Sequence, residues 1–391
     1  MTEWIECTLD KLGEIVGGAT PSTKCEDYYG GSIPWITPKD LSSFKGRYIT
    51  SGERNITEKG LASCSAQMMP KDAVLFTSRA PIGYVAIASQ SVCTNQGFKS
   101  IVVNEKADPL FVYYLLKYNK DAIEAMGSGT TFKEVSGKTM RAVKVRIPLD
   151  VSYQKRIAAV LDSLDTKIEN NERINDNLYA QAKAIFDNHF INIDAIPAGW
   201  RKGNLLDIAN YLNGLAMQKF RPQGNEIGLP VLKIKELRQG SCDDSSELCS
   251  LSIKPEYIIH DGDVVFSWSG SLLVDIWCGG TCGLNQHLFK VTSDVYDKWF
   301  YYLWTAHHLA RFIAIAADKA TTMGHIKREE LAKAEVLIPC EEDYTSFNSI
   351  MQPIFELMIS NRIESRKLAA LRDELLPKLM TGEIDVSDVQ L

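Results

Sequence analysis

Short apolar runs separated by glycine, proline and serine alternate with one longer amphipathic stretch along residues 1–150. The longer stretch, residues 109–125, predicts a helix, because a proline stands at its start and aromatic side chains recur on one face. The short runs have the β-branched and aromatic content of strands, which we expect at residues 74–76, 84–87 and 99–103. This mixture predicts an α+β domain.

The same order of elements returns about 190 to 196 residues later. Trp4 returns as Trp200 at an offset of 196, and Asn95 returns as Asn285 at an offset of 190. Solenoid repeats are only about 20 to 50 residues long, so this repeat is a duplicated domain. The second copy predicts strands at residues 231–234, 264–266 and 288–291 and a helix at residues 299–316.

After each copy the apolar residues adopt heptad spacing. Residues 153–189 contain no proline or glycine, and their apolar positions advance by alternating steps of four and three. The C-terminal segment has the same steps. We expect the two helices to bury these positions against each other in a helix–helix seam, formed by Ile157, Leu161, Leu164, Ile168 and Leu178 of one helix and by Ile350, Ile354, Leu357, Leu368, Leu371 and Leu375 of the other.

Polar residues interrupt both heptad series near their middle, at Asn171, Asn175 and Asn361. A buried asparagine in such a seam fixes the register of the helices at some cost in stability. The alternative is that Asn171 and Asn361 lie at an end or on the solvent side. About 36 residues at about 1.5 Å per residue make a rod of about 54 Å, which would act as a ruler between the two domains.

The pattern therefore predicts an α+β fold in which two long antiparallel coiled-coil helices join two duplicated domains with pseudo-two-fold symmetry. The division along the chain is a first domain at 1–150, a central helical spacer at 151–194, a second domain at 195–340 and a C-terminal helical spacer at 341–391.

Charge alone leaves nucleic-acid binding undecided. The net charge is −6, but residues 341–391 hold ten acidic against five basic residues, whereas residues 1–150 hold 18 basic against 16 acidic residues. No run of 18 apolar residues predicts a membrane span, and the N-terminus lacks the pattern of a signal peptide. Nine scattered cysteines indicate reduced thiols, so we expect a cytoplasmic protein.

No catalytic motif stands out in the sequence. Walker A, GxSxG, HExxH and the tetrapeptide of amino-methylating enzymes are all missing. The glycines from Gly13 to Gly18 are more simply a turn than a phosphate loop. His307, His308 and His325 are more simply helix and loop surface than metal ligands, and we expect no metal site.

What repeats is polar and borne by loops, which suits contact with nucleic acid. Hydroxyl groups and backbone amides suit phosphates, and basic or amide side chains suit base edges. Asn95 and Asn285 could instead cap buried backbone. The DNA-binding candidates of the first copy are Lys24, Lys39, Ser78, Arg79, Thr130, Thr131 and Lys133. Those of the second copy are Lys219, Arg221, Lys233, Lys235, Ser267, Trp268, Ser269, Thr321, Thr322 and Lys327.

Four strings resemble the specificity subunit of type I restriction–modification enzymes: Thr77 to Gly83 (TSRAPIG), Asn95 to Gly97 (NQG), Ile157 to Ile168 (IAAVLDSLDTKI) and Leu371 to Ile384 (LRDELLPKLMTGEI). The resemblance covers both halves of the chain. It implies two target-recognition domains that each read one half of an interrupted double-stranded DNA sequence. It also implies that the helical spacers bind two methyltransferase subunits and that motor–nuclease subunits join the full complex.

The resemblance further implies a non-catalytic chain that binds no cofactor itself, with S-adenosylmethionine, ATP and magnesium held by the partner subunits. Trp268 to Ser271 replace the Arg79 to Ile82 string in the second copy, so we expect two unlike half-sites and an asymmetric target. The alternatives are a self-sufficient DNA-modifying enzyme, which the missing motifs oppose, and a two-domain scaffold that does not bind DNA.

Overall fold

The computed structural model describes residues 3–129, 133–318 and 326–390, and the chain forms two compact units. The first unit consists of Met1–Glu169 with Leu368–Leu391, and the second consists of Asn170–Lys367. Thr130, Thr131, Thr321 and Thr322, all predicted to contact DNA, lie outside the described residues.

The first unit is built on a sheet with the strand order β2-β9-β6-β7-β4. Adjacent strands in this sheet are antiparallel, except that β4 and β7 are parallel. All five residues of β6 are buried, which explains why this strand was a clear apolar run in the sequence. The strands are β2 (Gly13–Gly17), β4 (Tyr48–Ile49), β6 (Val74–Ser78), β7 (Ile82–Ala88) and β9 (Lys99–Val103).

Two smaller sheets complete the strands of this unit. One has the order β5-β3-β8, and in the other β1 pairs antiparallel with β10, which joins the start of the domain to its end. Their strands are β1 (Trp4–Thr8), β3 (Tyr29–Ile36), β5 (Asn55–Ile56), β8 (Cys93–Thr94) and β10 (Lys144–Pro148), and short helices α1 (Pro38–Ser42) and α2 (Glu58–Ala62) lie between them.

The predicted helix at 109–125 is two helices, α3 (Pro109–Tyr118) and α4 (Lys120–Ala125). The Asn119 amide donates to the Leu115 carbonyl oxygen at 2.8 Å and competes with the helical backbone bonds there. At the other end Asp108 accepts from the Phe111 backbone N–H at 3.0 Å and caps α3. A further short helix, α5 (Gly137–Ala142), precedes β10.

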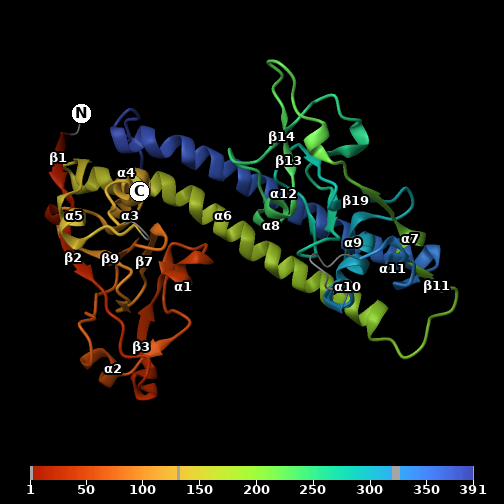
Figure 1. The fold of residues 1–391 in the computed structure, drawn as a ribbon, viewed down its shortest axis with the longest axis horizontal. Coiled ribbons are helices and arrows are strands. Elements are labelled where there is room, and N and C mark those ends of the chain that lie inside the picture. Colours follow the sequence, from red (N-terminus) through yellow and green to blue (C-terminus); the bar gives the residue numbers. More distant parts are fainter. Residues whose placement is uncertain (1–2, 130–132, 319–325, 391) are drawn as a thin grey trace. The chain divides into compact units, whose positions relative to one another are not determined.

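The second unit repeats this order, and Figure 1 labels some elements of each unit. Its main sheet has the order β12-β19-β16-β17, its second sheet β14-β13-β18-β15, and its terminal pair is β11-β20. The strands are β11 (Arg201–Asn204), β12 (Asn210–Asn213), β13 (Leu229–Leu232), β14 (Leu248–Cys249), β15 (Ile258–Ile259), β16 (Val264–Ser267), β17 (Leu273–Ile276), β18 (Cys282–Leu284), β19 (Leu288–Thr292) and β20 (Glu335–Ile338).

The helices of the second unit depart from the sequence prediction in two places. The predicted helix at 299–316 divides at His308 into α9 (Lys298–His307) and α10 (Leu309–Asp318). The predicted strand at 231–234 ends early, because the Glu236 carboxylate accepts from the Lys233 backbone N–H and starts α8 (Ile234–Gln239). The remaining short helices are α7 (Leu205–Ile208) and α11 (Arg328–Ala332).

Two long helices, α6 (Val151–Phe186) and α12 (Glu341–Thr381), are each shared between the units. Ile157 and Leu161 of α6 join Leu379 and Met380 of α12 in the core of the first unit. In the second unit a π-helical turn, Asp187–Ile191, continues α6 and carries Phe190 into the core. The long helices are therefore part of each unit's core as well as connections.

Within the second unit α6 and α12 run side by side and antiparallel (Figure 1). Asn171 is 1% exposed, and its amide donates to the Glu364 carboxylate at 2.7 Å. Asn361 donates to the Asn175 side-chain oxygen at 2.9 Å, and Asn175 donates to the Met358 carbonyl oxygen at 3.0 Å. The alternative that these asparagines face solvent is wrong, and the buried contacts fit a role in fixing register.

The predicted seam is wrong at three positions of α12. Ile350, Leu357 and Leu371 are 51%, 46% and 44% exposed. Met351 and Phe355 are buried instead. Each follows a predicted seam residue, Ile350 and Ile354 respectively. A heptad series cannot distinguish two adjacent apolar stripes, and here the larger side chains occupy the core. The other predicted seam residues are buried or partly buried, namely Ile157, Leu161, Leu164, Ile168, Leu178, Ile354, Leu368 and Leu375.

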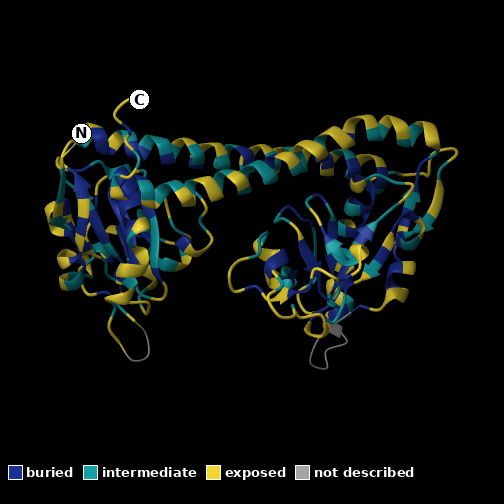
Figure 2. Cartoon of the chain, turned by 90° about the horizontal axis from the view of Figure 1, so that it is seen from above, coloured by how far each residue is buried: buried dark blue, intermediate teal, exposed yellow. Residues whose placement is uncertain are grey.

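Exposed and buried positions alternate along both long helices (Figure 2). Among the helices of the described ranges, none combines the length and the hydropathy needed to cross a membrane.

Candidate nucleic-acid interface

In the first unit, loops from three strands meet at one edge of the two larger sheets. The Ala19 N–H, after β2, donates to the Thr94 carbonyl oxygen at 3.0 Å, and the Asn95 N–H donates to the Ile36 carbonyl oxygen at 3.0 Å. The Asn95 side chain accepts from the Gly97 N–H at 2.8 Å. This bond caps the turn after β8. The Asn95 side chain therefore caps backbone, as in the alternative given for it in the sequence analysis.

Gly18 makes this meeting possible. A Cβ on Gly18 would lie 2.1 Å from the Asn95 carbonyl oxygen and 2.2 Å from that of Thr94. Its copy Gly214 is equally confined, since a Cβ there would lie 2.3 Å from the Asn285 carbonyl oxygen. Both glycines are therefore required by close approach of backbones. The turn expected from Gly13 to Gly18 is wrong, because Gly13–Gly17 form strand β2 and only Gly18 lies beyond its end.

The end of β6 adds a charged group to the same edge. The Glu134 carboxylate lies 3.7 Å from Arg79 and 3.6 Å from Lys99. The Val135 N–H donates to the Ser78 carbonyl oxygen at 2.9 Å, which ties the segment after residue 132 to β6. We call these segments the first loop edge: residues 18–24, 37–39, 79–81, 95–99 and 133–135, which include the start of α1 and the first residue of β9.

The second unit repeats the construction with other side chains. The Asn285 N–H donates to the Leu232 carbonyl oxygen at 3.2 Å, and the Asn285 side chain accepts from the His287 N–H at 3.2 Å. The Trp268 indole donates to the Asn213 side chain at 2.9 Å. The Ile326 N–H donates to the Trp268 carbonyl oxygen at 3.1 Å, as Val135 does to Ser78. Residues 214–221, 233–235, 268–271, 285–287 and 326–327 form the second loop edge.

Three predicted DNA contacts are wrong because the side chains are buried. Ser78 and Ser267 are 0% exposed and Ser269 is 5% exposed. The Ser78 hydroxyl donates to the Gly97 carbonyl oxygen at 3.2 Å, and the Ser267 hydroxyl donates to the Ser269 carbonyl oxygen at 3.2 Å. These hydroxyls hold the strand ends that present the loops, and they offer nothing to a ligand.

The basic candidates lie at the surface, where several form ion pairs. Lys39 pairs with Glu53, and Arg221 and Lys233 share Glu247. The Lys233 and Arg221 contacts lower the pKa of the Glu247 carboxyl, so it stays ionised and competes for both cations. The remaining candidates are partly or fully exposed, namely Lys24, Arg79, Lys133, Lys219, Lys235, Trp268 and Lys327.

Sequence reasoning missed Lys99, Gln96 and Gln286 as members of these edges. Lys99 lies in the strand after Asn95, and Gln96 is exposed and hydrogen-bonded to Thr20. The repeated Asn-Gln step does mark equivalent turns in the sequence, but neither glutamine was among the predicted DNA contacts.

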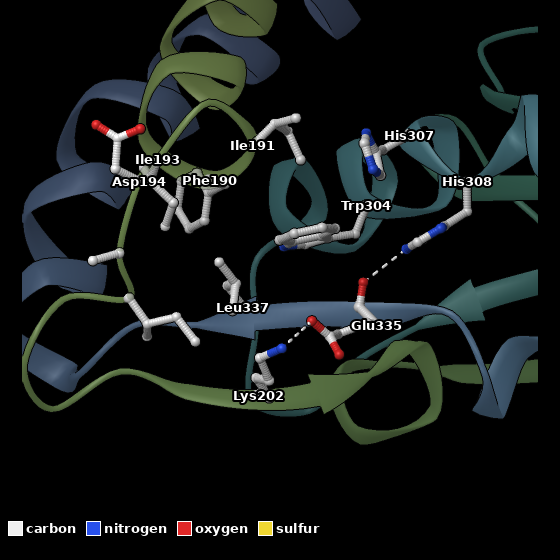
Figure 3. Close-up of a pocket in the computed structure, with 12 residues that line it drawn as sticks. Phe190, Ile191, Ile193, Asp194, Lys202, Trp304, His307, His308, Glu335 and Leu337 are labelled. Atoms are coloured by element: carbon white, nitrogen blue, oxygen red, sulfur yellow. Dashed lines mark hydrogen bonds and ion pairs between the residues drawn. The ribbon is translucent and has the colours of Figure 1, made fainter.

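A separate groove of about 380 Å³ lies in the second unit, with Phe190 and Trp304 on its walls (Figure 3). His308 is 9% exposed, and its Nε2 donates to the Glu335 carbonyl oxygen at 2.8 Å. Burial lowers the pKa of His308 and of His307. The expectation that this pair lies on the helix surface is wrong for His308, which is a structural residue. Within the described ranges no cluster of three or more histidine, cysteine or acidic side chains could hold a metal ion.

The fold and the loop edges define a class: a protein with two copies of one α+β domain, each presenting unlike polar loops, on shared long helices. Comparison with known proteins makes the class specific. A family model described as the type I restriction modification DNA specificity domain matches residues 1–180. The chain is 34% identical to the type I restriction enzyme MjaIX specificity subunit of Methanocaldococcus jannaschii, over 99% of this chain and 95% of that one. The chain belongs to the family of type I restriction enzyme specificity subunits.

Other similar proteins are specificity subunits of the same family. The EcoR124I/EcoR124II specificity subunit of Escherichia coli is 29% identical over 41% of this chain and 40% of its own length. The crystal structure of the type I restriction–modification S subunit from M. genitalium has the same fold, with a TM-score of 0.59 and 14% identity over 97% of this chain and 96% of that one.

Proposed function

We propose that this chain is the sequence-specific DNA-binding subunit of a type I restriction–modification system and that it recognises a two-part, asymmetric DNA target. The observation that carries the proposal is the duplicated frame with unlike loop edges. The first edge carries the ion pair between Arg79 and Glu134, whereas the second carries the hydrogen bond from Trp268 to Asn213. Side chains that read base edges must differ where the bases differ, so two unlike edges fit two unlike half-sites.

Each loop edge contacts one half-site, with shape readout supplementing a few base contacts. Lys24 and Lys133 on the first edge and Lys219 and Lys327 on the second are exposed and suit the phosphates. Arg79 suits a guanine edge once a phosphate or base displaces Glu134. The lengths of α6 and α12 set the gap between the half-sites.

The chain is non-catalytic and directs methylation and restriction by partner subunits. Two methyltransferase subunits bind its long helices, and motor–nuclease subunits complete the restriction enzyme. S-adenosylmethionine, ATP and magnesium bind to those partners. The complex acts in the cytoplasm, in keeping with cysteines that are all free.

Exposed apolar side chains on α12 support the position of the methyltransferase contact. Ile350 and Leu357, one heptad apart, are 51% and 46% exposed, and Leu371, two heptads further on, is 44% exposed. A heptad stripe that its own fold leaves uncovered suits a partner helix or an apolar groove. Ile350→Glu with Leu357→Glu should weaken binding of purified methyltransferase subunit, whereas Ile227→Glu, at a residue 85% exposed in a loop, should not.

The central experiment reconstitutes the chain with its methyltransferase subunits and maps the methylated bases by sequencing. The expected result is one interrupted motif with two different halves. Arg79→Ala should reduce discrimination in one half by about tenfold or more and leave the other half unchanged. Lys219→Ala, which removes a proposed phosphate contact, should weaken binding about equally for all sequences and reduce its salt dependence. An insertion of one or two helical turns in both long helices should lengthen the gap and keep both halves.

Two outcomes would contradict the proposal. Methyl transfer by the purified chain alone, with DNA and S-adenosylmethionine, would make it a self-sufficient enzyme. Failure of the reconstituted complex to bind genomic DNA better than random DNA would favour a scaffold that does not read sequence.

A further inference from the structure

Arg47 attaches the globular part of the first unit to α6. Its guanidinium donates to the Asp162 carbonyl oxygen at 3.1 Å and to the Thr166 hydroxyl at 2.9 Å, and it lies 3.2 Å from both the Asp162 and the Glu169 carboxylates. The Arg47 side chain is 6% exposed. We call Arg47, Asp162 and Glu169 the first clamp.

α6 continues its acidic character next to the first clamp. Asp165, 8% exposed, accepts from the Tyr114 hydroxyl at 2.8 Å and from Arg372 of α12 at 2.6 Å. The face of α6 in this unit is therefore acidic, and the globular part offers it a cation.

The second unit has a clamp of opposite polarity. Arg362 of α12 makes two hydrogen bonds to the Asp275 carboxylate, at 2.9 and 2.8 Å. Arg366 makes two to Asp261, at 2.7 and 2.8 Å, and one to the Cys278 carbonyl oxygen at 2.6 Å. These four charged residues are the second clamp. Here the helix supplies the cations and the globular part supplies the carboxylates.

The paired geometry favours ionised partners in the second clamp. Burial acts to raise the pKa of Asp261, but hydrogen bonds from Arg366 and the Gly280 N–H outweigh it and leave the pKa below its usual value. Burial acts to lower the pKa of Arg362, and the hydrogen bonds to Asp275 reverse that effect.

We propose that the inverted polarity of the two clamps selects which globular domain docks on which long helix. A duplicated frame creates an ambiguity, because two domains with the same strands present similar apolar faces to two similar helices. Charge removes it. Arg47 docked on the part of α12 that forms the second clamp would meet Arg362 and Arg366, and Asp261 docked on the part of α6 that forms the first clamp would add a carboxylate to an acidic face. Like charges brought together at these partly desolvated contacts disfavour both wrong arrangements, within one chain or between two copies.

The wrong arrangements matter only if the domains read different half-sites, so the functional value of the clamps rests on the proposed function. Their docking role does not. Hydrogen exchange measured by mass spectrometry on the full-length chain, without DNA or partners, separates the two questions.

Arg47→Glu should accelerate amide exchange about 100-fold at Tyr48–Ile49 and in α6 near Asp162, while exchange in the second unit stays unchanged. Adding Asp162→Arg and Glu169→Arg should restore slow exchange. In the second unit Asp275→Arg should accelerate exchange in β17 about tenfold, less than in the first clamp because Arg362 and Asp275 are 31% and 28% exposed, and Arg362→Asp should restore it.

Controls identify the role of charge. Lys39→Glu reverses a cation whose side chain is 78% exposed and should leave exchange unchanged. Arg47→Glu combined with Arg362→Asp reverses one charge in each clamp, so amide exchange should stay fast at both clamps. Arg47→Met keeps most of the packing and should have a smaller effect than Arg47→Glu. Equal effects of Arg47→Met and Arg47→Glu, or reversed pairs that fail to restore slow exchange, would overturn the proposal.

Discussion

Phe190 is the side chain whose truncation we expect to damage the second unit most. It is 2% exposed and lies at the π-helical turn that continues α6. Its ring packs on side chains from four parts of the unit at centroid distances of 5.1 to 6.2 Å, namely Phe186, Trp200, Trp299, Phe300, Trp304 and Phe347. Phe190→Ala removes the centre of this cluster.

The expected loss follows from this burial. Truncating a buried phenylalanine to alanine costs about 3–5 kcal/mol, and the upper part of that range applies because surrounding rings cannot collapse into the space. In a unit of about 200 residues each kcal/mol lowers Tm by about 2–4 °C. Phe190→Ala should therefore lower the Tm of the second unit by about 8–20 °C.

Tryptophan fluorescence suits the measurement, because five of the seven tryptophans belong to the second unit. Phe220→Ala is the matched control, since Phe220 is 37% exposed, and it should shift Tm by less than about 3 °C. If Phe190→Ala shifted Tm no more than this control does, the cluster would not hold the end of α6 on the second unit, and the reasoning would be refuted.

Three further predictions concern single residues. Gly18→Ala should lower Tm in a thermal melt and DNA affinity in a gel shift of the reconstituted complex, because its Cβ would lie 2.1 Å from the Asn95 carbonyl oxygen. Gly17→Ala is the control, because a Cβ there meets no atom within 4 Å, and it should leave Tm and DNA affinity unchanged. Tyr114→Phe should cost about 1.5–3 kcal/mol in urea unfolding by removing the hydroxyl that donates to Asp165. Burial lowers the pKa of His308 below 6.5, so the unfolded chain binds protons more readily, and the free energy of unfolding measured in urea should fall as the pH drops from 7 to 5. His308→Gln should reduce this pH dependence of the free energy of unfolding, and an unchanged pH dependence would contradict the prediction.

The frame could be predicted from the sequence because its evidence is local and repeated. Strands such as β6 and β16 are apolar runs that recur at one offset, and an internal copy distinguishes a strand from a chance run. Helix breaks at Asn119 and His308 escaped prediction for different reasons. The Asn119 side chain bonds locally to the Leu115 carbonyl oxygen, which apolar spacing does not reveal, whereas the His308 bond to Glu335 forms only in the folded unit. Heptad spacing found both long helices but selected the wrong stripe at Ile350, since it carries no information on which side chain the neighbouring domain contacts.

Site residues were harder to predict than the frame. Residue type found the exposed lysines, although Lys39 lies in α1 and Lys235 in α8 instead of the expected loops. The same reasoning chose Ser78 and Ser267, whose hydroxyls are used inside the fold. The clamps lay beyond sequence reasoning altogether. Arg47 and Asp162 are separated by 115 residues, and only packing brings them together.

The sharing of α12 between the units affects how the chain can be made. Leu379, Met380 and Val386 are 1–2% exposed in the core of the first unit, yet the ribosome synthesises them after the whole second unit. The first domain to emerge must therefore wait, with part of its apolar core open, until the last helix arrives. A chain whose translation stops within α12 would keep both sets of loops and lack a closed first core, which makes it a target for chaperones and proteases.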